Sequence, residues 1–166
     1  MTTQVLIVTL LSICTGACNG VPPETPPDFA FVFKSQSAGV YTLNTFNETF
    51  CRRTKSTGDT TIPFHLGKAQ LDSVYTLLRG IDFFSLPEYL EPEGGVMAFP
   101  SPWSTLQVRA NGVTKRISFG GSFAPGVKAT ENLNRVNEFI MGMIVNSPEY
   151  RGLPHSTDSQ QVNLAE

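Results

Sequence analysis

One dipeptide between two alternating segments constrains the fold more than any other feature of the 166-residue chain. Asn111-Gly112 separates residues 106–110 from residues 113–119, and apolar and polar residues alternate on both sides. Asn-Gly is a preferred centre of a two-residue type I′ turn, so the stretch predicts a β-hairpin with Ala110 opposite Val113. The predicted apolar face holds Leu106, Val108, Ala110, Val113, Ile117 and Phe119. The opposite, wet face of this antiparallel pair holds Gln107, Arg109, Thr114, Arg116 and Ser118.

Period-2 alternation predicts further strands nearer the N-terminus. Phe29, Phe31 and Phe33 alternate over residues 29–34, and residues 40–46 and 49–55 follow as a second and a third candidate strand. Residues 56–60 (STGDT) are rich in turn-forming residue types and predict a turn. Residues 62–66 continue the chain after this turn.

Two segments have the apolar spacing of amphipathic helices. In residues 68–79, apolar residues recur at i, i+3 and i+7 from Leu71 and form an apolar stripe. Gly80 predicts the end of this helix. Residues 131–145 contain a second stripe of this kind. The order ββ(β)-α-ββ-α predicts an α+β fold. We expect a two-layer sandwich in which an antiparallel sheet of four to five strands carries two helices on one face.

The N-terminal part of the chain has the pattern of an export signal. The first 17 residues carry no Asp, Glu, Lys or Arg, and Val5–Ile13 is a short apolar run that cannot cross a hydrocarbon core of ~30 Å. Four prolines in residues 18–28 predict an extended tether. One α+β domain is expected over residues 29–154, followed by a disordered polar tail at 155–166.

Residues Thr15-Gly16-Ala17-Cys18 resemble a bacterial lipobox, in which a cysteine after small residues becomes the lipidated N-terminus. Thr15 stands where that pattern prefers Leu, Val or Ile. The resemblance implies lipidation at Cys18 and a lipoprotein anchored to a membrane of the bacterial cell envelope, facing periplasm or exterior. Cleavage by an ordinary signal peptidase after Ala17, which would give a secreted protein, is the alternative. Cys51 then lacks a partner if Cys18 is lipidated, and we expect its thiol to be buried.

Composition and motifs argue against several function classes. The formal charge is −2 and only 16 % of residues are charged, so no nucleic-acid partner is expected. The sequence has no metal-ligand spacing, no phosphate-binding glycine motif and no nucleophile elbow, and we predict no catalytic residue, no metal and no cofactor. A Cys51–His65 nucleophile pair is conceivable. A structural thiol and imidazole are the stronger interpretation.

Residues 88–103 are the most unusual segment. They run for more than the ~12–15 residues beyond which connections in compact domains are uncommon. Aromatic and Met side chains on a proline-stiffened segment suit protein recognition. The predicted partner-binding residues are Tyr89, Met97, Phe99 and Trp103. In the alternative interpretation, Phe99 and Trp103 fold back and cover the edge of the sheet.

The stretch from Ile62 to Val145 resembles small domains of bacterial exported proteins. The resemblance lies in the plug Asp82–Pro87 (DFFSLP), the hairpin Val108–Ile117, Pro125 and the C-terminal helix. In outline such domains are similar to emfourin-type inhibitors of thermolysin-like metalloproteases, although no inhibitory residue can be carried over by position.

Three function classes follow from these observations. A membrane-tethered protein-binding module comes first, with inhibition of an exported metalloprotease as one form of it. A structural envelope protein is the alternative, and an enzyme is the third. The expected partners are the membrane, through an N-terminal lipid, and a protein; no oligomeric state is predicted.

Overall fold

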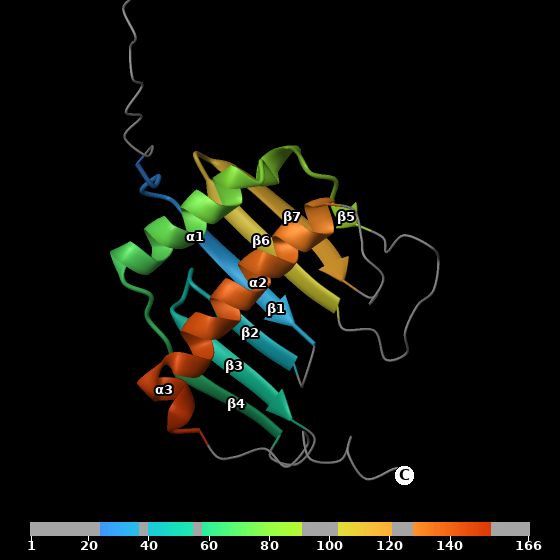
Figure 1. The fold of residues 1–166 in the computed structure, drawn as a ribbon. Coiled ribbons are helices and arrows are strands. Elements are labelled where there is room, and N and C mark those ends of the chain that lie inside the picture. Colours follow the sequence, from blue (N-terminus) through green and yellow to red (C-terminus); the bar gives the residue numbers. More distant parts are fainter. Residues whose placement is uncertain (1–23, 37–39, 55–57, 91–102, 121–127, 154–166) are drawn as a thin grey trace, which may run out of the picture.

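The computed structural model describes residues 24–36, 40–54, 58–90, 103–120 and 128–153. Most of this part of the chain lies in strands and helices (Figure 1). In chain order the elements are β1 (Ala30–Ser35), β2 (Val40–Asn44), β3 (Thr49–Thr54), β4 (Gly58–Pro63), α1 (Lys68–Gly80), the 3-10 turn η1 (Phe83–Ser85), β5 (Tyr89–Leu90), β6 (Trp103–Ala110), β7 (Val113–Gly120), α2 (Lys128–Asn146) and α3 (Pro148–Arg151).

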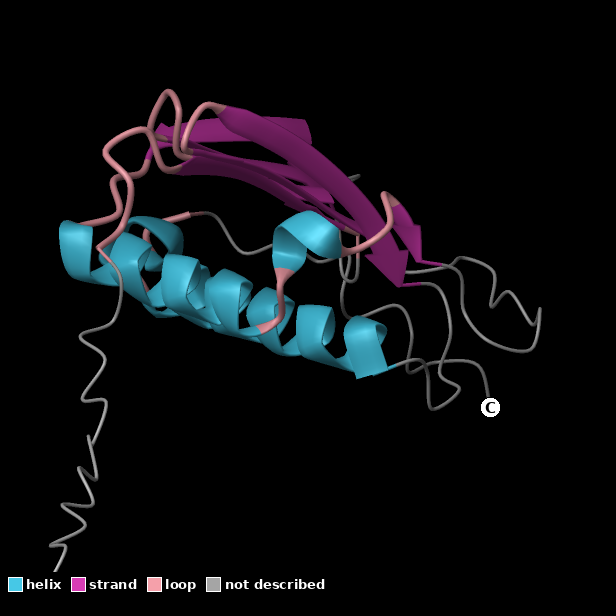
Figure 2. Cartoon of the chain, turned by 90° about the horizontal axis from the view of Figure 1, so that it is seen from above, coloured by secondary structure: helices cyan, strands magenta, loops and turns pink. Residues whose placement is uncertain are grey.

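The described strands form one open sheet. It has seven strands in the order β4-β3-β2-β1-β6-β7-β5, and every neighbouring pair is antiparallel except β5 with β7. Figure 1 shows α1 and α2 side by side, and Figure 2 shows the helices on one face of this sheet, which curves around them. The α+β prediction is therefore confirmed.

The predicted number of four to five strands is wrong, because the sheet has seven. β4 begins inside the segment 56–60 that was predicted as a turn, where Gly58 and Asp59 have low β-propensity. It forms because its backbone pairs along the whole of β3, from Thr54↔Gly58 to Thr49↔Pro63. β5 is only two residues long and lies in the segment predicted as a recognition loop.

The core lies between the sheet and the two long helices. Alternate strand residues bury their side chains toward the helices, which contribute one apolar stripe each. The fully buried large residues are Phe31, Phe33, Phe50, Phe83, Phe119, Leu43, Leu78, Leu106, Ile117, Leu133, Ile140 and Ile144. Among the described residues, no helix lies on the other face of the sheet (Figure 2).

The predicted hairpin is confirmed in register and in turn geometry. Ala110 pairs with Val113 and Leu106 with Ile117, and φ is 52° at Asn111 and 75° at Gly112. Val113 lies on the apolar side as predicted but is 56 % exposed. Lys115 shares this side, and its Nζ donates a hydrogen bond of 2.7 Å to the backbone carbonyl of Phe84.

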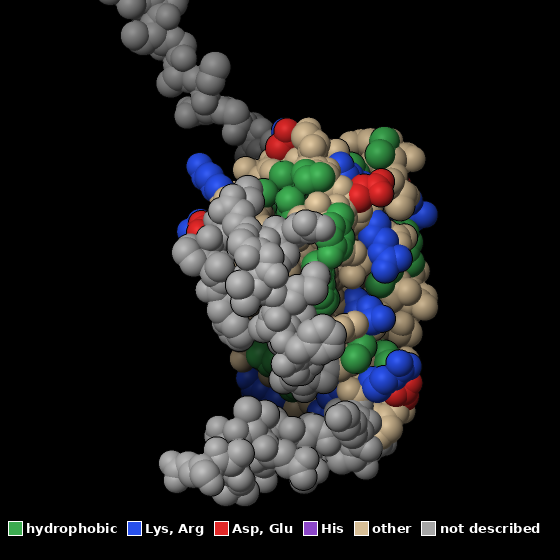
Figure 3. All heavy atoms as spheres, turned by 90° about the vertical axis from the view of Figure 1, so that its right-hand side faces the viewer, with side chains coloured by type: hydrophobic (Ala, Val, Ile, Leu, Met, Phe, Trp, Pro, Cys, Tyr) green, Lys and Arg blue, Asp and Glu red, His purple; other side chains and the backbone are tan. Residues whose placement is uncertain are grey.

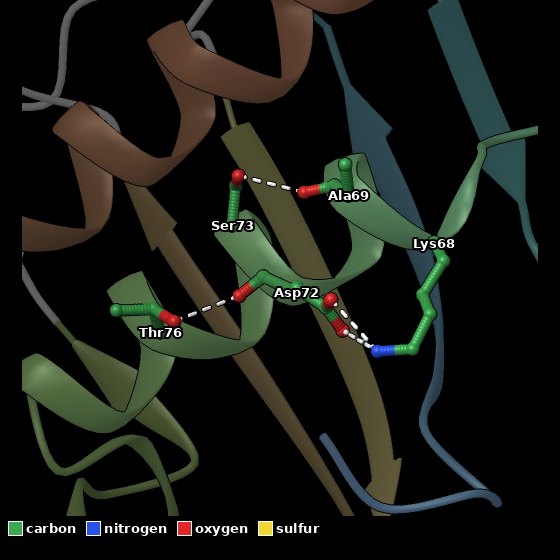
Figure 4. A network of polar contacts seen from close by, with 5 residues as sticks. All are labelled: Lys68, Ala69, Asp72, Ser73 and Thr76. Carbon is green, nitrogen blue, oxygen red and sulfur yellow. Dashed lines mark hydrogen bonds and ion pairs between the residues drawn. The ribbon is translucent and has the colours of Figure 1, made fainter. Parts of the chain in front are cut away.

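The exposed side of α1 satisfies its polar side chains within the helix (Figure 4). Lys68 Nζ lies 2.9 Å from Asp72 Oδ2, and the Ser73 hydroxyl donates to the carbonyl of Ala69 at 2.8 Å. Thr76 donates to the carbonyl of Asp72 in the same way. These are the local contacts of a solvated helix surface. In the described ranges, no helix combines the length and apolarity that crossing a membrane requires.

Candidate functional site

The face of the sheet opposite the helices, which we call the open face, carries the described residues that sequence analysis singled out for partner binding. Register places Tyr89 opposite Ser118 and Trp103 opposite Gly120. Both aromatic residues therefore belong to the open face, since Leu90 and Ser104, the neighbours along their strands, are buried on the other side.

Tyr89 and Trp103 stack on each other across β7. Their ring centroids are 5.3 Å apart with an interplanar angle of 21°. Gly120, which has φ 111° and no side chain, lies between their strands and leaves room for this contact. Tyr89 is 47 % exposed and Trp103 is half-buried, so the pair presents an aromatic surface at the sheet edge.

Two of the four predicted partner-binding residues are thus brought together. Met97 and Phe99 lie outside the described residues, as does Cys18. The stacking of Trp103 on Tyr89 also covers the sheet near β5, which is what the edge-covering interpretation expects of Trp103.

The middle of the open face is a row of small polar side chains around one lysine. Lys34 lies between Thr42 on β2 and Thr105 on β6. The row continues to Cys51 and Thr61 on one side and to Ser118 and Tyr89 on the other. Hydroxyl groups donate and accept hydrogen bonds, so this row can bind polar groups of a partner.

A third aromatic residue, Phe46, lies at the opposite end of the open face. The guanidinium carbon of Arg109 is 4.7 Å from the ring centroid of Phe46, which is 39 % exposed. The small side chain of Ala30 lies opposite Arg109 and is buried. A cation over an aromatic face is attracted by the ring quadrupole.

The open face is predominantly cationic. Arg53 is neutralised by Asp59, with two hydrogen bonds of 2.7 Å that lower the pKa of the Asp59 carboxyl and raise that of Arg53. Lys34, Arg109 and Arg116 form no ion pair with another described residue. Figure 3 shows Lys and Arg side chains (blue) along the right-hand side of the molecule. This surface is therefore complementary to negative charge.

Cys51 and His65, the conceivable nucleophile pair, are not brought together. Cys51 is half-buried on β3, opposite Thr61, so the expectation of a buried thiol is met only in part. His65 follows β4, and its Nδ1 lies 2.9 Å from Glu48 Oε1. Among the described residues no three His, Cys, Asp or Glu side chains are grouped as metal ligands would be.

The basic character of the open face was visible in part from the sequence. Alternation around the hairpin placed Arg109 and Arg116 on the wet face. Their proximity to Lys34 and Phe46 depends on β1 pairing with both β2 and β6, which no local signal reports. No protein-family model matches the chain, and no curated protein sequence matches it.

Proposed function

We propose that this protein is a non-enzymatic, lipid-anchored module of the bacterial cell envelope that binds a protein partner through its open face. One observation carries the proposal: Tyr89 and Trp103 form an exposed stacked pair at the edge of that face. Tyr and Trp are enriched in interface cores, where truncating one often costs ~2 kcal/mol of binding energy or more.

The surroundings of the pair support a protein partner. The open face is broad, and it combines aromatic residues, hydroxyls and the cations Lys34 and Arg116. Arg is enriched at protein interfaces, and unpaired cations raise the rate of encounter with an acidic surface. Acylation at Cys18 would hold this face near the membrane, where the partner would be found.

Partner capture by paired variants tests this proposal. Purified wild type, Tyr89→Ala and Trp103→Ala are immobilised and used to capture proteins from solubilised native membranes. We expect both variants to lose the partner that wild type captures. Phe139→Ala is the matched control, because Phe139 is an aromatic residue of α2 with 38 % exposure, on the helix side of the sheet.

Unfolding curves separate binding from packing. If Trp103 only covers the sheet, Trp103→Ala costs up to ~3–5 kcal/mol of stability, as for a buried Trp. A strongly destabilised Trp103→Ala protein contradicts the role of that residue. Tyr89→Ala remains informative in that case, because half of this side chain is already exposed. Normal capture by a stable Tyr89→Ala protein contradicts the proposal.

Two alternatives predict other results. An inhibitor of an exported metalloprotease, which the likeness to emfourin-type domains suggests, would slow peptide hydrolysis by a thermolysin-like enzyme when added in excess. A structural envelope protein would capture nothing through Tyr89 and Trp103, and its deletion would alter the envelope instead.

A further inference from the structure

A second surface feature lies on the helix side of the sheet, away from the open face. A cavity of about 370 Å³ opens between the C-terminal half of α1, η1 and the tip of the β6–β7 hairpin. Its volume falls in the range of ~300–1,000 Å³ that is typical of small-molecule sites. Val113, the exposed residue at the start of β7, lies at this cavity.

The walls of the cavity are apolar and rigidly held. Leu78, Phe83 and Val108 line it and are almost completely buried. The Tyr75 ring also lines it and is fixed edge-on against Phe29, with centroids 5.1 Å apart. Such walls bind an apolar group by removing its surface from water.

The polar residues that line the cavity are exposed and carry both signs of charge. Arg79 is in the last turn of α1, and Asp82 follows two residues after the helix. Asp82 has φ 51°, a left-handed conformation that turns the chain out of α1. Among the described residues, neither Arg79 nor Asp82 forms an ion pair. The Asn111 side chain adds one amide donor and acceptor.

We propose that this cavity binds a free amino acid with an apolar side chain. The side chain occupies the space between Leu78, Phe83 and Val108. The carboxylate of the ligand pairs with Arg79, and its ammonium group pairs with Asp82. Both groups are attached to the α-carbon, so the polar end of the ligand contacts both charged residues. This site is independent of the partner-binding function proposed for the open face.

Calorimetric titration of the purified full-length protein with five small molecules tests the assignment. L-phenylalanine and L-leucine should bind, and L-serine, which lacks the apolar body, should not. 3-Phenylpropanoate lacks the ammonium group and 2-phenylethylamine lacks the carboxylate; each should bind at least tenfold more weakly than L-phenylalanine. Equal affinity of these two compounds and L-phenylalanine would overturn the proposed charge recognition.

Charge-neutralising variants assign the two ionic contacts. Arg79→Gln should weaken L-phenylalanine at least tenfold and leave 2-phenylethylamine unchanged, whereas Asp82→Asn should weaken L-phenylalanine and leave 3-phenylpropanoate unchanged. Both residues are exposed, so folding should survive. Arg135→Gln on α2, which removes an exposed arginine outside the cavity, should bind as wild type does.

A space-filling variant locates the ligand. Ala110→Leu places a larger side chain in the cavity wall and should reduce binding of every ligand. No binding of L-phenylalanine or L-leucine at millimolar concentration overturns the proposal, and so does normal binding by a folded Ala110→Leu protein. If Ala110→Leu does not fold, the two charge variants decide alone.

Discussion

Asp28 binds the turn of the hairpin from the other end of the domain. Its Oδ2 accepts a hydrogen bond of 2.8 Å from the backbone N–H of Gly112, 84 residues further along the chain. Its Oδ1 accepts a second bond of 2.9 Å from the N–H of Asn111. Asp28, two residues before β1, therefore holds the tip of the β6–β7 hairpin, and β1 pairs with β6 from Ala30↔Arg109 to Ser35↔Ser104.

The contact of Asp28 with the turn predicts a pH-dependent stability. The hydrogen bond from Gly112 is the largest cause and lowers the pKa of the Asp28 carboxyl. Desolvation opposes it, and the hydrogen bond from Asn111 lowers the pKa further, so the net direction is downward. A carboxyl whose pKa is lower in the folded state stabilises the fold above its unfolded pKa, and this stability is lost as the pH falls through the folded pKa. We expect Asp28→Asn to be less stable than wild type at neutral pH.

Urea unfolding of both proteins from neutral pH down to about pH 2 measures this effect. The difference in unfolding free energy between wild type and Asp28→Asn should shrink as the pH falls. A difference that stays constant over the whole range would show that the charge of Asp28 has no part in holding the turn.

Replacement of glycine by alanine should have opposite effects on stability at Gly112 and at Gly142. Gly112 has φ 75°, where an L side chain is strained, so Gly112→Ala should cost about 1–2 kcal/mol. Gly142 lies inside α2, and a Cβ added there would meet no other atom within 4 Å, so Gly142→Ala should stabilise by roughly 0.5–1 kcal/mol. Chemical denaturation of both variants gives the comparison. Equal effects at the two sites would contradict the turn geometry.

The hairpin was predictable because its signals are local. Asn111-Gly112 sets the turn, and the alternation of residues 106–119 sets the register. The end of α1 shows where local signals compete. Gly80 predicted the helix end, yet the helix includes Gly80, and the left-handed residue that follows it is Asp82. Asp adopts this conformation more readily than most residues, so the glycine signal was two residues early.

The elements that sequence reasoning missed depend on tertiary pairing. β4 contains Gly58 and Asp59, and only its pairing with β3 makes it a strand. β5 pairs in parallel with β7, although Tyr89 and Ser118 are far apart in the sequence. The candidate site follows the same rule. Sequence analysis predicted a binding role for Tyr89 and Trp103, but their stacking depends on β5 and β6 lying on either side of β7.

Lipidation at Cys18 predicts the cellular fraction in which the protein is found. Several acyl chains give stable anchoring, whereas a single chain gives only marginal and reversible binding. Wild type should sediment with membranes and Cys18→Ala should be soluble. Cys51→Ala is the matched control and should sediment like wild type, because Cys51 lies in β3 of the folded domain. If wild type and Cys18→Ala distribute equally, Cys18 does not carry the anchor.

We expect the Tyr41 hydroxyl to lose its proton in a late step of the alkaline titration of the protein. Its side chain is buried on β2, and burial, together with the neighbouring Tyr150, raises its pKa to about 12 from an ordinary value of 10.0. Arg52 acts in the opposite direction, but more weakly. The folded protein therefore retains this proton between about pH 10 and pH 12 while the unfolded chain releases it, so stability falls as the pH rises through that range.

Absorbance of tyrosinate, followed together with circular dichroism to identify the folded range, measures this step. Tyr41→Phe should remove the late step. Tyr150→Phe should retain it but move it to lower pH, because the neighbour that helps to raise the Tyr41 pKa is gone while burial remains. Tyr89→Phe, on the open face, should leave the late step where it is. Persistence of the late step in Tyr41→Phe would assign it to another residue and would contradict the burial of the Tyr41 hydroxyl beside Tyr150.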